Sequence, residues 1–531
     1  MREKAESNGQ DLLVVDTGDR IEGNGLSDAS EPKGKYISDI FKQQQVDVIC
    51  TGNHELYKRN SSEHEYNITV PNFKDSYLSS NVDIIDPRSG KYVPLAPRFK
   101  KFATRKQGIR IIAFGFLFDF TENENNTKVQ PVEQTVKEAW FQEAIRDREV
   151  DLFLVIGHVP VRSAEFEILF KTIRKVQWDT PIQFLGGHTH IRDYKKYDDK
   201  SYALESGRFM ETIGFQSING LPTTNKSQVS TRRLQFSRRY IDSNLYSFHH
   251  HTGLNSTTFP TQLGLNVSKE ITKSRDDLHL DRTYGCASQD LWMSRVKYPG
   301  NSSIFSWMDE LVLPEMAIDK SRANASRLVM INTGALRFDI FKGPFTRDSA
   351  FIVSPFTSGF QYVQDVPFSK AMKLIDVLNN GAQMLQEMNP KLREWALGPI
   401  HQQGRKIELS TRETSHTFDV HQIPMGSKPK LSPGYTTEDD AGSDGDDTEH
   451  SPIPFYKVPN VVQSRVDAPS LTGDPKTVDM VYDSFIEPWL LLAFRYLGLN
   501  YTIADTQVYM EGEDLTTLLV KWVTKHWGDD C

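Results

Sequence analysis

Cysteine is scarce in this sequence of 531 residues, which contains only Cys50, Cys286 and Cys531. An odd and sparse set of cysteines excludes the dense disulfide framework that holds small secreted domains together. Cys50 ends the apolar run VDVIC, so we expect its thiol to be buried and to have a structural role.

Long apolar runs are also absent. The best candidate, PWLLLAFRYLGL, carries Arg495 and is shorter than the roughly 20 residues that a membrane-spanning helix needs. The first residues, MREKAESNGQ, are charged and lack the apolar centre of a secretory signal. We therefore expect no membrane span, and the sequence as written lacks a signal peptide.

An excess of positive charge is missing too. Lys and Arg number 62 against 70 Asp and Glu, which gives a net charge of −8, whereas nucleic-acid-binding proteins concentrate positive charge. We therefore expect no nucleic-acid partner. With 38% hydrophobic and 25% charged residues the chain has a globular composition, and its length predicts two or three domains.

Glycosylation sequons, in contrast, are more frequent than the roughly three or four that composition would produce, and they matter only in secreted or lumenal chains. They begin at Asn60, Asn67, Asn125, Asn225, Asn255, Asn266, Asn301, Asn324 and Asn500. This excess predicts the secretory pathway, as a lumenal or extracellular protein. Because no signal is present, we expect that the sequence is incomplete at its amino terminus.

The first 240 residues alternate apolar runs with amphipathic stretches. The runs DLLVV, VDVIC, IRIIAFGF, DLFLVIG and IQFLGG are short and end at Gly or polar residues, which favours buried strands. SEPKGKYISDIFKQQQ, which Ser30 could cap, and PVEQTVKEAWFQEAIRD, which starts at Pro131, favour helices. This alternation predicts an α/β layered domain.

The remaining sequence divides by composition. Residues 241–284 are polar and predict a connector between domains, whereas patterned sequence resumes over residues 285–402. Residues 403–475, which include EDDAGSDGDD, predict a disordered acidic loop. Residues 476–531 are apolar again, and we expect them to fold back and complete the second domain, after a first domain of residues 1–240.

Four of the five predicted strands end in residues of the types that bind metals. The four motifs are Gly18-Asp19, the sequence GNHE at 52–55, Gly157-His158, and the sequence GHTH at 187–190. Because the carboxyl ends of strands in an open α/β sheet face one crevice, we expect these side chains to meet there. Asp, Asn and His together suit Mn, Fe or Zn rather than a soft thiolate site.

This ordered set of motifs resembles the calcineurin-like metallophosphoesterase superfamily. The segment LVMINTGALRFDIFKGPFTRDSAFIVSPF resembles the substrate-binding domain of the 5'-nucleotidase family, in a branch of fungal type. The resemblance covers most of residues 10–400. It implies a layered β-sandwich phosphoesterase domain flanked by helices, followed by a smaller α+β substrate domain. It also implies a phosphoester hydrolase of nucleotide catabolism, with the vacuole lumen as one possible location.

Carried over residue by residue, the resemblance implies two divalent metal ions (Mn, Zn or Fe) and a bridging hydroxide that attacks a nucleotide-like phosphate monoester. Asp19 would bridge the metals, and His54 would stabilise charge or protonate the leaving oxygen. The other implied ligands are Asn53, His158 and His188 for the second metal and His190 for the first. The implied substrate residues are Asn332, Gly334, Arg337 and Phe356, of which Phe356 competes with Phe351 and Phe360 as the stacking face for a nucleobase.

The sequence departs from the family pattern in two places. The family begins with an Asp-x-His strand that supplies two ligands of the first metal, and nothing before Asp11 provides it. An Asp-x-His at Asp277 and His279 lies in the connector and is a poor substitute. Tyr57 stands where the family often places an Asp that orients the imidazole of His54, a role that would pass to Glu55, to another group or to none.

These departures leave alternatives open. We expect the amino-terminal strand to be missing from this sequence, so that the first metal site is incomplete here. Otherwise the chain would be a non-catalytic protein that binds a nucleotide or a partner, and a phosphodiesterase or UDP-sugar hydrolase on the same scaffold is a further alternative. His249, His250 and His251 could bind a metal, but no carboxylate or Cys stands near them at ligand spacing, which favours a solvated connector.

Overall fold

The structure is a computed structural model. It describes residues 1–222, 234–381, 384–385, 388–389, 397–400, 402, 454, 456–469, 471–528 and 531. The Asn225 sequon and the acidic sequence EDDAGSDGDD lie outside the described residues.

The described chain forms two compact units. Unit 1 contains Met1–Ile21 and Glu31–Thr272, and unit 2 contains Glu22–Ser30 together with the described parts of Lys273–Gln403 and Ile453–Cys531. The short segment Glu22–Ser30 thus belongs to unit 2, although it follows the predicted ligand Asp19 directly in the chain.

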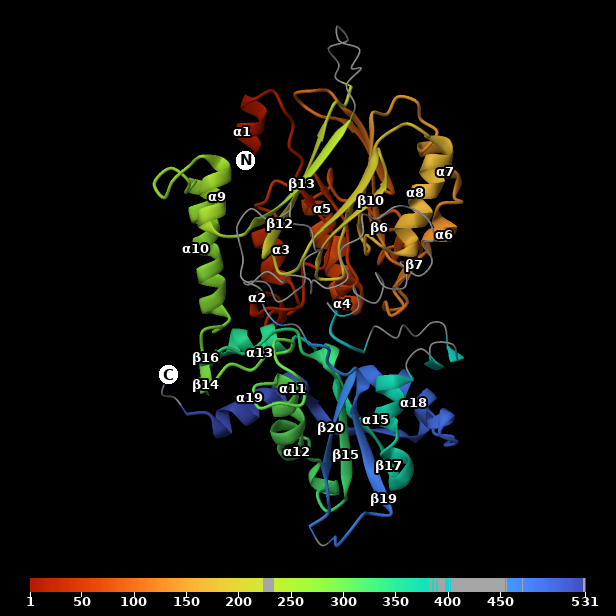
Figure 1. Cartoon of the computed structure of the whole chain (residues 1–531), viewed down its shortest axis with the longest axis vertical. Helices are drawn as coiled ribbons and strands as arrows, with labels where there is room; N and C mark the ends of the chain where they lie inside the picture. The colour runs from red at the N-terminus through yellow and green to blue at the C-terminus, as the bar shows by residue number, and fades with distance from the viewer. Residues whose placement is uncertain are drawn as a thin grey trace, which may run out of the picture. The chain divides into compact units, whose positions relative to one another are not determined.

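A six-stranded sheet is the centre of unit 1 (Figure 1). Its strands, in spatial order, are β10 (Arg192–Asp198), β11 (Ser201–Ser206), β9 (Ile182–Gly186), β8 (Leu152–His158), β6 (Arg110–Leu117) and β5 (Phe99–Ala103). The four middle strands run parallel, and the edge strands β10 and β5 run antiparallel to them. The predicted strands in IRIIAFGF, DLFLVIG and IQFLGG are confirmed as β6, β8 and β9.

A second, two-stranded parallel sheet packs on one face of this sheet. It consists of β1 (Val15–Asp16) and β2 (Val48–Ile49), the strands predicted in DLLVV and VDVIC. Val48 and Cys50 share a buried cluster with Ile111 of β6 and Leu154 of β8. Cys50 is 1% exposed, which confirms the expected buried thiol.

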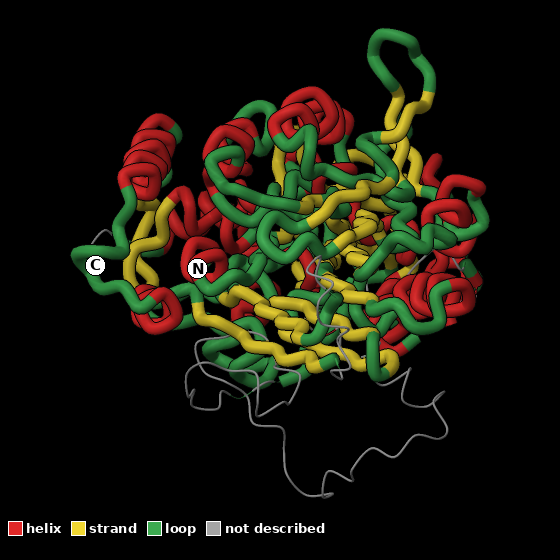
Figure 2. Tube along the Cα trace, turned by 90° about the horizontal axis from the view of Figure 1, so that it is seen from above, coloured by secondary structure: helices red, strands yellow, loops and turns green. Residues whose placement is uncertain are grey.

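Helices cover the opposite face of the sheet. Successive strand residues point to opposite sides, so each strand supplies residues to both faces. The ring of Phe141 in α7 (Ala139–Ala144) lies 5.0 Å from that of Phe114 in β6, between ring centroids. Phe166 in α8 (Ala164–Val176) lies 5.1 Å from Phe184 in β9. In Figure 2 most of the helices lie around the strands, toward the edge of the view. The expected layered α/β domain is confirmed.

Two predicted helices differ from the structure. The helix that Ser30 was expected to cap begins at residue 35 as α3 (Lys35–Phe41). It follows Gly34, whose backbone is left-handed, and the Ser30 hydroxyl donates instead to the Ser27 carbonyl. The helix expected from Pro131 is divided into α6 (Val132–Thr135) and α7, because Glu138 between them is extended.

Smaller elements complete unit 1. The helices are α1 (Arg2–Ser7), η1 (His54–Leu56), α4 (Arg59–His64), η2 (Glu65–Thr69) and α5 (Val70–Asn72). The strands are β3 (Val82–Ile85), β4 (Tyr92–Pro94), β7 (Thr127–Val129), β12 (Thr212–Asn219) and β13 (Gln235–Asp242).

The segment expected as a polar connector, residues 241–284, is largely exposed but helical. It contains α9 (Leu245–Thr252) and α10 (Gln262–Asp277). The Asn244 side chain caps α9 by accepting the Ser247 N–H, and Gly253 ends the helix in a left-handed conformation. Local capping therefore forms a helix where the low apolar content of the sequence indicated none.

A five-stranded sheet is the centre of unit 2. Its strands, in spatial order, are β18 (Val461–Val466), β15 (Arg327–Asn332), β19 (Thr477–Asp483), β17 (Gly359–Pro367) and β20 (Thr506–Asp514). β19 lies between β15 and β17, so residues near the carboxyl terminus complete a sheet that begins 150 positions earlier. Residues 461–466 fall inside the predicted loop 403–475, and that prediction is wrong for them because Val461 and Val462 are fully buried beside β15.

Helices cover both faces of this sheet and a two-stranded ribbon accompanies it. The elements are α2 (Gly25–Asp28), β14 (Thr283–Ala287), α11 (Ile304–Trp307), η3 (Met308–Val312), α12 (Leu313–Met316), η4 (Lys320–Arg322), η5 (Thr333–Ala335), β16 (Gly343–Thr346), α13 (Arg347–Val353), α14 (Phe368–Ala371), α15 (Leu374–Asn380), η7 (Ser484–Ile486), α18 (Glu487–Tyr496), η8 (Ile503–Asp505) and α19 (Leu515–His526).

A disulfide joins Cys286 in β14 to Cys531, across 245 positions of sequence and a Cα–Cα distance of 5.3 Å. The sparse cysteines therefore include one cross-link, which their spacing did not indicate. The Cys286 N–H also donates to the Gly528 carbonyl, and the Trp527 ring stacks on Trp307. The carboxyl terminus is thus fixed to the body of unit 2.

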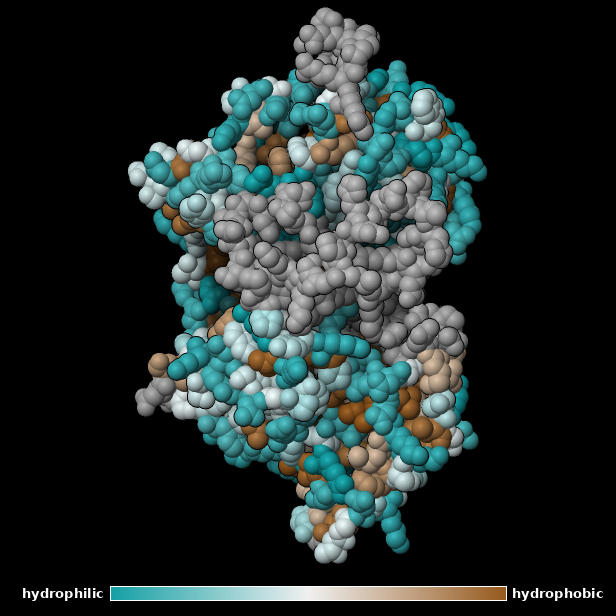
Figure 3. Space-filling view, viewed as in Figure 1, coloured by the Kyte–Doolittle hydropathy of each residue, from teal (hydrophilic) through white to brown (hydrophobic). Residues whose placement is uncertain are grey.

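Among the helices that the structure describes, none has both the length and the apolar character that crossing a bilayer requires. The face drawn in Figure 3 is mostly hydrophilic, with apolar residues scattered over it.

Candidate metal centre and substrate-side residues

Two glycine turns bring the ends of β1 and β2 into contact. A Cβ on Gly18, whose φ is 93°, would lie 2.3 Å from the Gly52 nitrogen. A Cβ on Gly52 would lie 2.0 Å from Oδ1 of Asp19. Only glycine fits both positions, so the turns formed by the motifs GD and GNHE pack against each other through their backbones.

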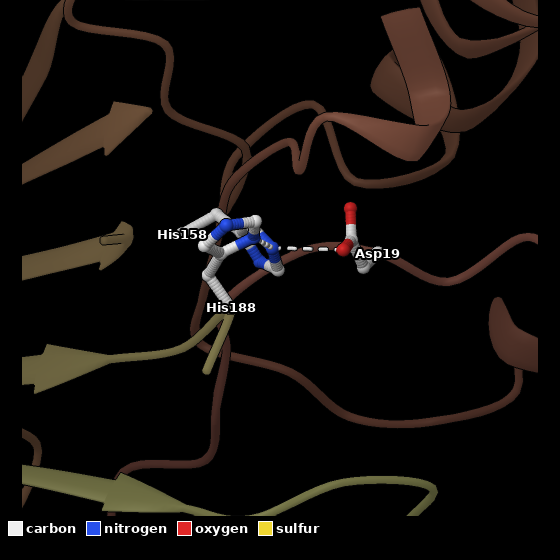
Figure 4. Close-up of side chains that lie close together, drawn as sticks. All are labelled: Asp19, His158 and His188. Atoms are coloured by element: carbon white, nitrogen blue, oxygen red, sulfur yellow. Dashed lines mark hydrogen bonds and ion pairs between the residues drawn. The ribbon is translucent and has the colours of Figure 1, made fainter. Parts of the chain in front are cut away.

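Three predicted ligands converge beside these turns, as Figure 4 shows. Nε2 of His158, at the end of β8, lies 2.8 Å from Oδ2 of Asp19. Nδ1 of His188, in the loop after β9, lies 3.2 Å from the same His158 nitrogen. One ligand atom from each side chain lies within 4.8 Å of the others, and all three residues are largely buried.

A hydrogen bond of the His158 ring indicates what this group can bind. Its Nδ1 lies 3.0 Å from the Thr17 carbonyl, which can only accept, so Nδ1 carries a proton. With a proton on Nδ1, Nε2 is the nitrogen whose lone pair can bind a cation, and it lies beside a carboxylate oxygen and a second imidazole nitrogen. Such a cluster of electron-pair donors fits a divalent cation, and a backbone carbonyl on the far nitrogen is the usual support of a metal-binding histidine.

Asp19 carries the negative charge that a metal ligand needs. Burial alone would raise the pKa of its carboxyl, but His158 and His54 outweigh burial and hold this pKa well below its ordinary value. The backbone of Asp19 is left-handed, with φ of 60°. An aspartate in this conformation implies that the turn is held by its surroundings.

Asn53 and His54 lie beside Asp19. The Asn53 amide donates to the Tyr57 hydroxyl at 3.2 Å, while its Oδ1 is buried and accepts no hydrogen bond from the described residues. This oxygen also fits a cation. The His54 backbone N–H donates to Asp19 Oδ1 at 3.0 Å, and its Nε2 lies 3.8 Å from Asp19 Oδ2.

Tyr57 and Glu55 have roles that the sequence left open. The Tyr57 ring meets the His54 imidazole edge-on, 5.3 Å between centroids, so packing helps to hold that ring. The Glu55 carboxylate accepts the N–H groups of Asp19, Arg20 and Gly52 at 3.1, 2.6 and 2.8 Å. Glu55 is 1% exposed and fastens the two interlocked turns together.

A buried charge network supports this fastening from behind. Arg20 donates to Asp16 at 2.7 Å, to the Cys50 carbonyl at 2.8 Å and to Glu65. Burial disfavours the charged guanidinium, but Glu65 and Glu55 outweigh burial and raise the pKa of Arg20. The network joins the ends of both strands to helix η2.

The other candidates for metal ligands lie outside this group. The His190 ring packs against Phe209, at 5.5 Å between centroids. Asp277 ends helix α10, with His279 two residues beyond it, and the three consecutive histidines lie in α9. Within the described part of the chain, Asp19, His158 and His188 are the only cluster of three or more His, Cys, Asp or Glu side chains at ligand spacing.

The predicted substrate residues of unit 2 gather at the end of β15. The Asn332 amide, oriented to satisfy its neighbours, donates to Asp483 at 2.7 Å and accepts the Ala335 N–H at 3.3 Å. A Cβ on Gly334 would lie 2.8 Å from the Gly398 carbonyl, so this position also requires glycine. Asn332 and Gly334 thus shape the turn that leads to Arg337.

Arg337 and Phe356 face each other. The Arg337 guanidinium carbon lies 4.7 Å from the centre of the Phe356 ring, and the Arg337 N–H donates to the Val353 carbonyl. Phe356 is partly exposed, whereas Phe360 is 1% exposed and belongs to the core. Of the predicted aromatic residues, Phe356 therefore combines exposure with a cationic neighbour.

Comparisons with known proteins agree with this architecture. Residues 1–192 match the calcineurin-like phosphoesterase family, and residues 290–491 match the C-terminal domain of NAD nucleotidase. The solved 5'-nucleotidase of Candida albicans SC5314 is 38% identical, with a TM-score of 0.84 over 99% of this chain and 91% of that one. This chain belongs to the 5'-nucleotidase family of calcineurin-like phosphoesterases.

Two fungal relatives of this family member are similar along their length. An uncharacterized protein of Schizosaccharomyces pombe is 37% identical over 100% of this chain and 86% of its own length. A protein of Arthroderma benhamiae that is named as a secreted protein is 34% identical over 96% of this chain and 82% of its own. The resemblance and the fold expected from the sequence are confirmed.

Proposed function

We propose that this chain hydrolyses a nucleotide-like phosphate monoester with the help of two divalent metal ions. The observation that supports this most is the meeting of Asp19, His158 and His188 at the ends of three strands, in a member of the 5'-nucleotidase family. Buried nitrogen and oxygen donors without a thiolate suit Mn, Zn or Fe.

In this proposal Asp19 would hold both cations, and Asn53, His158 and His188 would complete the second site. His190 belongs to the first. When bound, the cations supply an activated water and neutralise charge on the phosphoryl group. The residues of the chain hold that site rigid, since Glu55 and the interlocked glycines fix the turns that carry Asp19 and Asn53.

His54 is the proposed acid for the leaving oxygen. It is 6% exposed, is held by the Tyr57 ring and lies beside the Asp19 carboxylate. An imidazole is a common proton donor in catalysis, so His54 fits this role. In unit 2, Arg337 and Phe356 are the proposed contacts for a nucleotide, through a cation and a face on which a base stacks.

The test is phosphate release by the full chain from a panel of esters, after removal of metals and addition of Mn²⁺, Zn²⁺ or Fe²⁺. The panel contains 5'-nucleotides, glycerol phosphate, a phosphodiester and a UDP-sugar. We expect 5'-nucleotides to be cleaved and His188→Ala to lose at least about 100-fold in kcat. Preference for the diester or the UDP-sugar would contradict the proposed substrate class.

A non-catalytic nucleotide-binding protein is the second candidate. The observation that favours it is the single cluster of three ligands among the described residues, with His190 packed on Phe209 instead. Counting the metals in the purified chain separates the two functions. About two per chain supports hydrolysis and contradicts the non-catalytic function.

We also propose that the protein is a glycoprotein of the vacuole lumen or the cell exterior. Every sequon asparagine among the described residues is exposed. The Cys286–Cys531 disulfide is typical of an oxidising compartment, and the Arthroderma benhamiae relative is named as a secreted protein. Treatment of native protein with an N-glycosidase should lower its mass, whereas unmodified asparagines throughout would contradict this location.

A further inference from the structure

A second buried glutamate contacts the loop that carries His188 and His190. Glu205 lies near the end of β11, paired with Gly186 at the end of β9, and is 1% exposed. Its Oε1 accepts the Thr189 N–H at 2.9 Å and also the Thr189 hydroxyl. Thr189 is the residue between the two histidines of the GHTH loop.

This loop needs such support because of its backbone. His188 and His190 both have left-handed backbones, with φ of 83° and 64°. Side chains other than glycine rarely adopt this conformation, and each instance costs about 1–3 kcal/mol unless the surroundings impose it. The two hydrogen bonds on Thr189 lie between these strained residues and oppose relaxation of the loop.

The loop that Glu205 holds touches the loop that follows His158. In the same region the Gly187 N–H donates to the Val159 carbonyl at 3.2 Å. A Cβ on Gly186 would lie 2.6 Å from that carbonyl, so the two loops touch. The bonds from Thr189 to Glu205 therefore hold the His188 loop at the place where it packs against the loop of His158.

We infer that Glu205 is a positioning residue for the metal centre. It fixes the loop of His188, which packs against the loop of His158, as Glu55 fixes the turns of Asp19 and Asn53. This inference rests on the proposed metal-dependent function. Glu205 does not touch the reacting atoms, and its effect passes through Thr189 and the histidines.

The design of variants follows from the hydrogen bonds. Burial raises the pKa of Glu205 well above its ordinary value, and the bonds from Thr189 lower it again only in part. A glutamine keeps an oxygen acceptor and the same shape, so Glu205→Gln should retain the support. Glu205→Leu removes every acceptor, and Thr189→Val removes only the hydroxyl bond.

The control is Asp151, a buried carboxylate at the far end of β8. It accepts the Arg110 backbone N–H at 2.8 Å and pairs with the Arg110 guanidinium. Strand β8 separates it from His158 by roughly 23 Å, at about 3.3 Å per residue. Asp151→Asn therefore disturbs a buried carboxylate of unit 1 without touching the ligand loops.

The measurement is the affinity of metal-free full chain for Mn²⁺, by competition with a chromophoric chelator, together with hydrogen exchange of residues 187–191. We expect Glu205→Leu to weaken Mn²⁺ binding at least about 10-fold and Thr189→Val about threefold. Glu205→Gln and Asp151→Asn should stay within about 1.5-fold of wild type. Exchange over 187–191 should quicken in Glu205→Leu alone among the four.

The outcomes distinguish the role of Glu205 from the metal-dependent function. Wild-type Mn²⁺ affinity in Glu205→Leu, or an equal loss in Asp151→Asn, would overturn the role of Glu205 while leaving the metal-dependent function intact. A wild-type chain that binds no divalent cation would overturn both. If Glu205→Leu does not fold, Thr189→Val decides, because wild-type affinity in that variant would refute the inference.

Discussion

Replacing Glu55 tests how the first pair of metal-ligand turns is held. Its carboxylate accepts three backbone N–H groups, from Asp19, Arg20 and Gly52, at 2.6–3.1 Å. In Glu55→Ala these donors lose their partner in a buried site, at about 1–3 kcal/mol each. Burial raises the pKa of Glu55, so removing the charge returns part of this free energy. We expect a net loss of about 3 kcal/mol.

Glu55→Gln should cost less, and the structure indicates by how much. Oε2 accepts from Asp19 and Gly52, whereas Oε1 accepts from Arg20 alone. A glutamine with its oxygen in the Oε2 position keeps two bonds and loses one, which amounts to about 1.5 kcal/mol. The exposed pair of Glu133 with Lys137 gives the control, since Glu133→Ala should change stability by less than about 0.5 kcal/mol.

Hydrogen exchange measured by mass spectrometry reads the free energy of local opening in peptides that cover residues 14–22 and 48–56. A loss of about 3 kcal/mol corresponds to exchange roughly 100-fold faster in Glu55→Ala, and about tenfold in Glu55→Gln. Exchange in Glu55→Ala within about threefold of wild type would refute the reasoning, as would equal acceleration in Glu133→Ala.

Three further outcomes concern unit 2. Burial raises the pKa of Asp483 from 3.8 to about 6, so protonation stabilises the fold, and stability is lost as pH rises from about 4 through 6. Compared with Asp483→Asn, wild type should lose up to about 3 kcal/mol over this range in urea unfolding, and parallel curves would contradict this. The Thr516 hydroxyl donates to the carbonyls of Ser354 and Phe356. Thr516→Val should therefore raise KM for a 5'-nucleotide about threefold and leave KM for glycerol phosphate unchanged. Equal effects on both esters would refute a role of Phe356 in binding the nucleotide. Cys531→Ser opens a loop of 245 positions and should cost about 2–5 kcal/mol in unfolding of unit 2 under non-reducing conditions, whereas an unchanged transition would show that the disulfide adds nothing.

The ligand positions could be predicted because the sequence places each at the end of a strand. Asp19, His158 and His188 all follow apolar runs that form β1, β8 and β9. Strand direction then brings them to one edge, whatever the length of the loops between. The same regularity identified the core strand β6 and the buried Cys50.

Features that depend on long-range pairing could not be predicted in this way. Glu205 reaches Thr189 because β11 pairs directly with β9, although β10 lies between them in the sequence. No local pattern signals that arrangement. Val461 lies in a sequence rich in Pro and polar residues. It is part of strand β18 only because β18 pairs with β15. The partnership of Cys286 with Cys531 is likewise set by the packing of the carboxyl terminus.

The central claim is that Asp19, His158 and His188 form the metal centre of a phosphomonoesterase. Its most direct test is the rate of phosphate release from a 5'-nucleotide by metal-free full chain titrated with Mn²⁺, in wild type and in His158→Ala. Activity that rises with Mn²⁺ and is lost by at least about 100-fold in the variant is the predicted result. Phosphate release that is independent of added metal, or equal in both proteins, would contradict the claim.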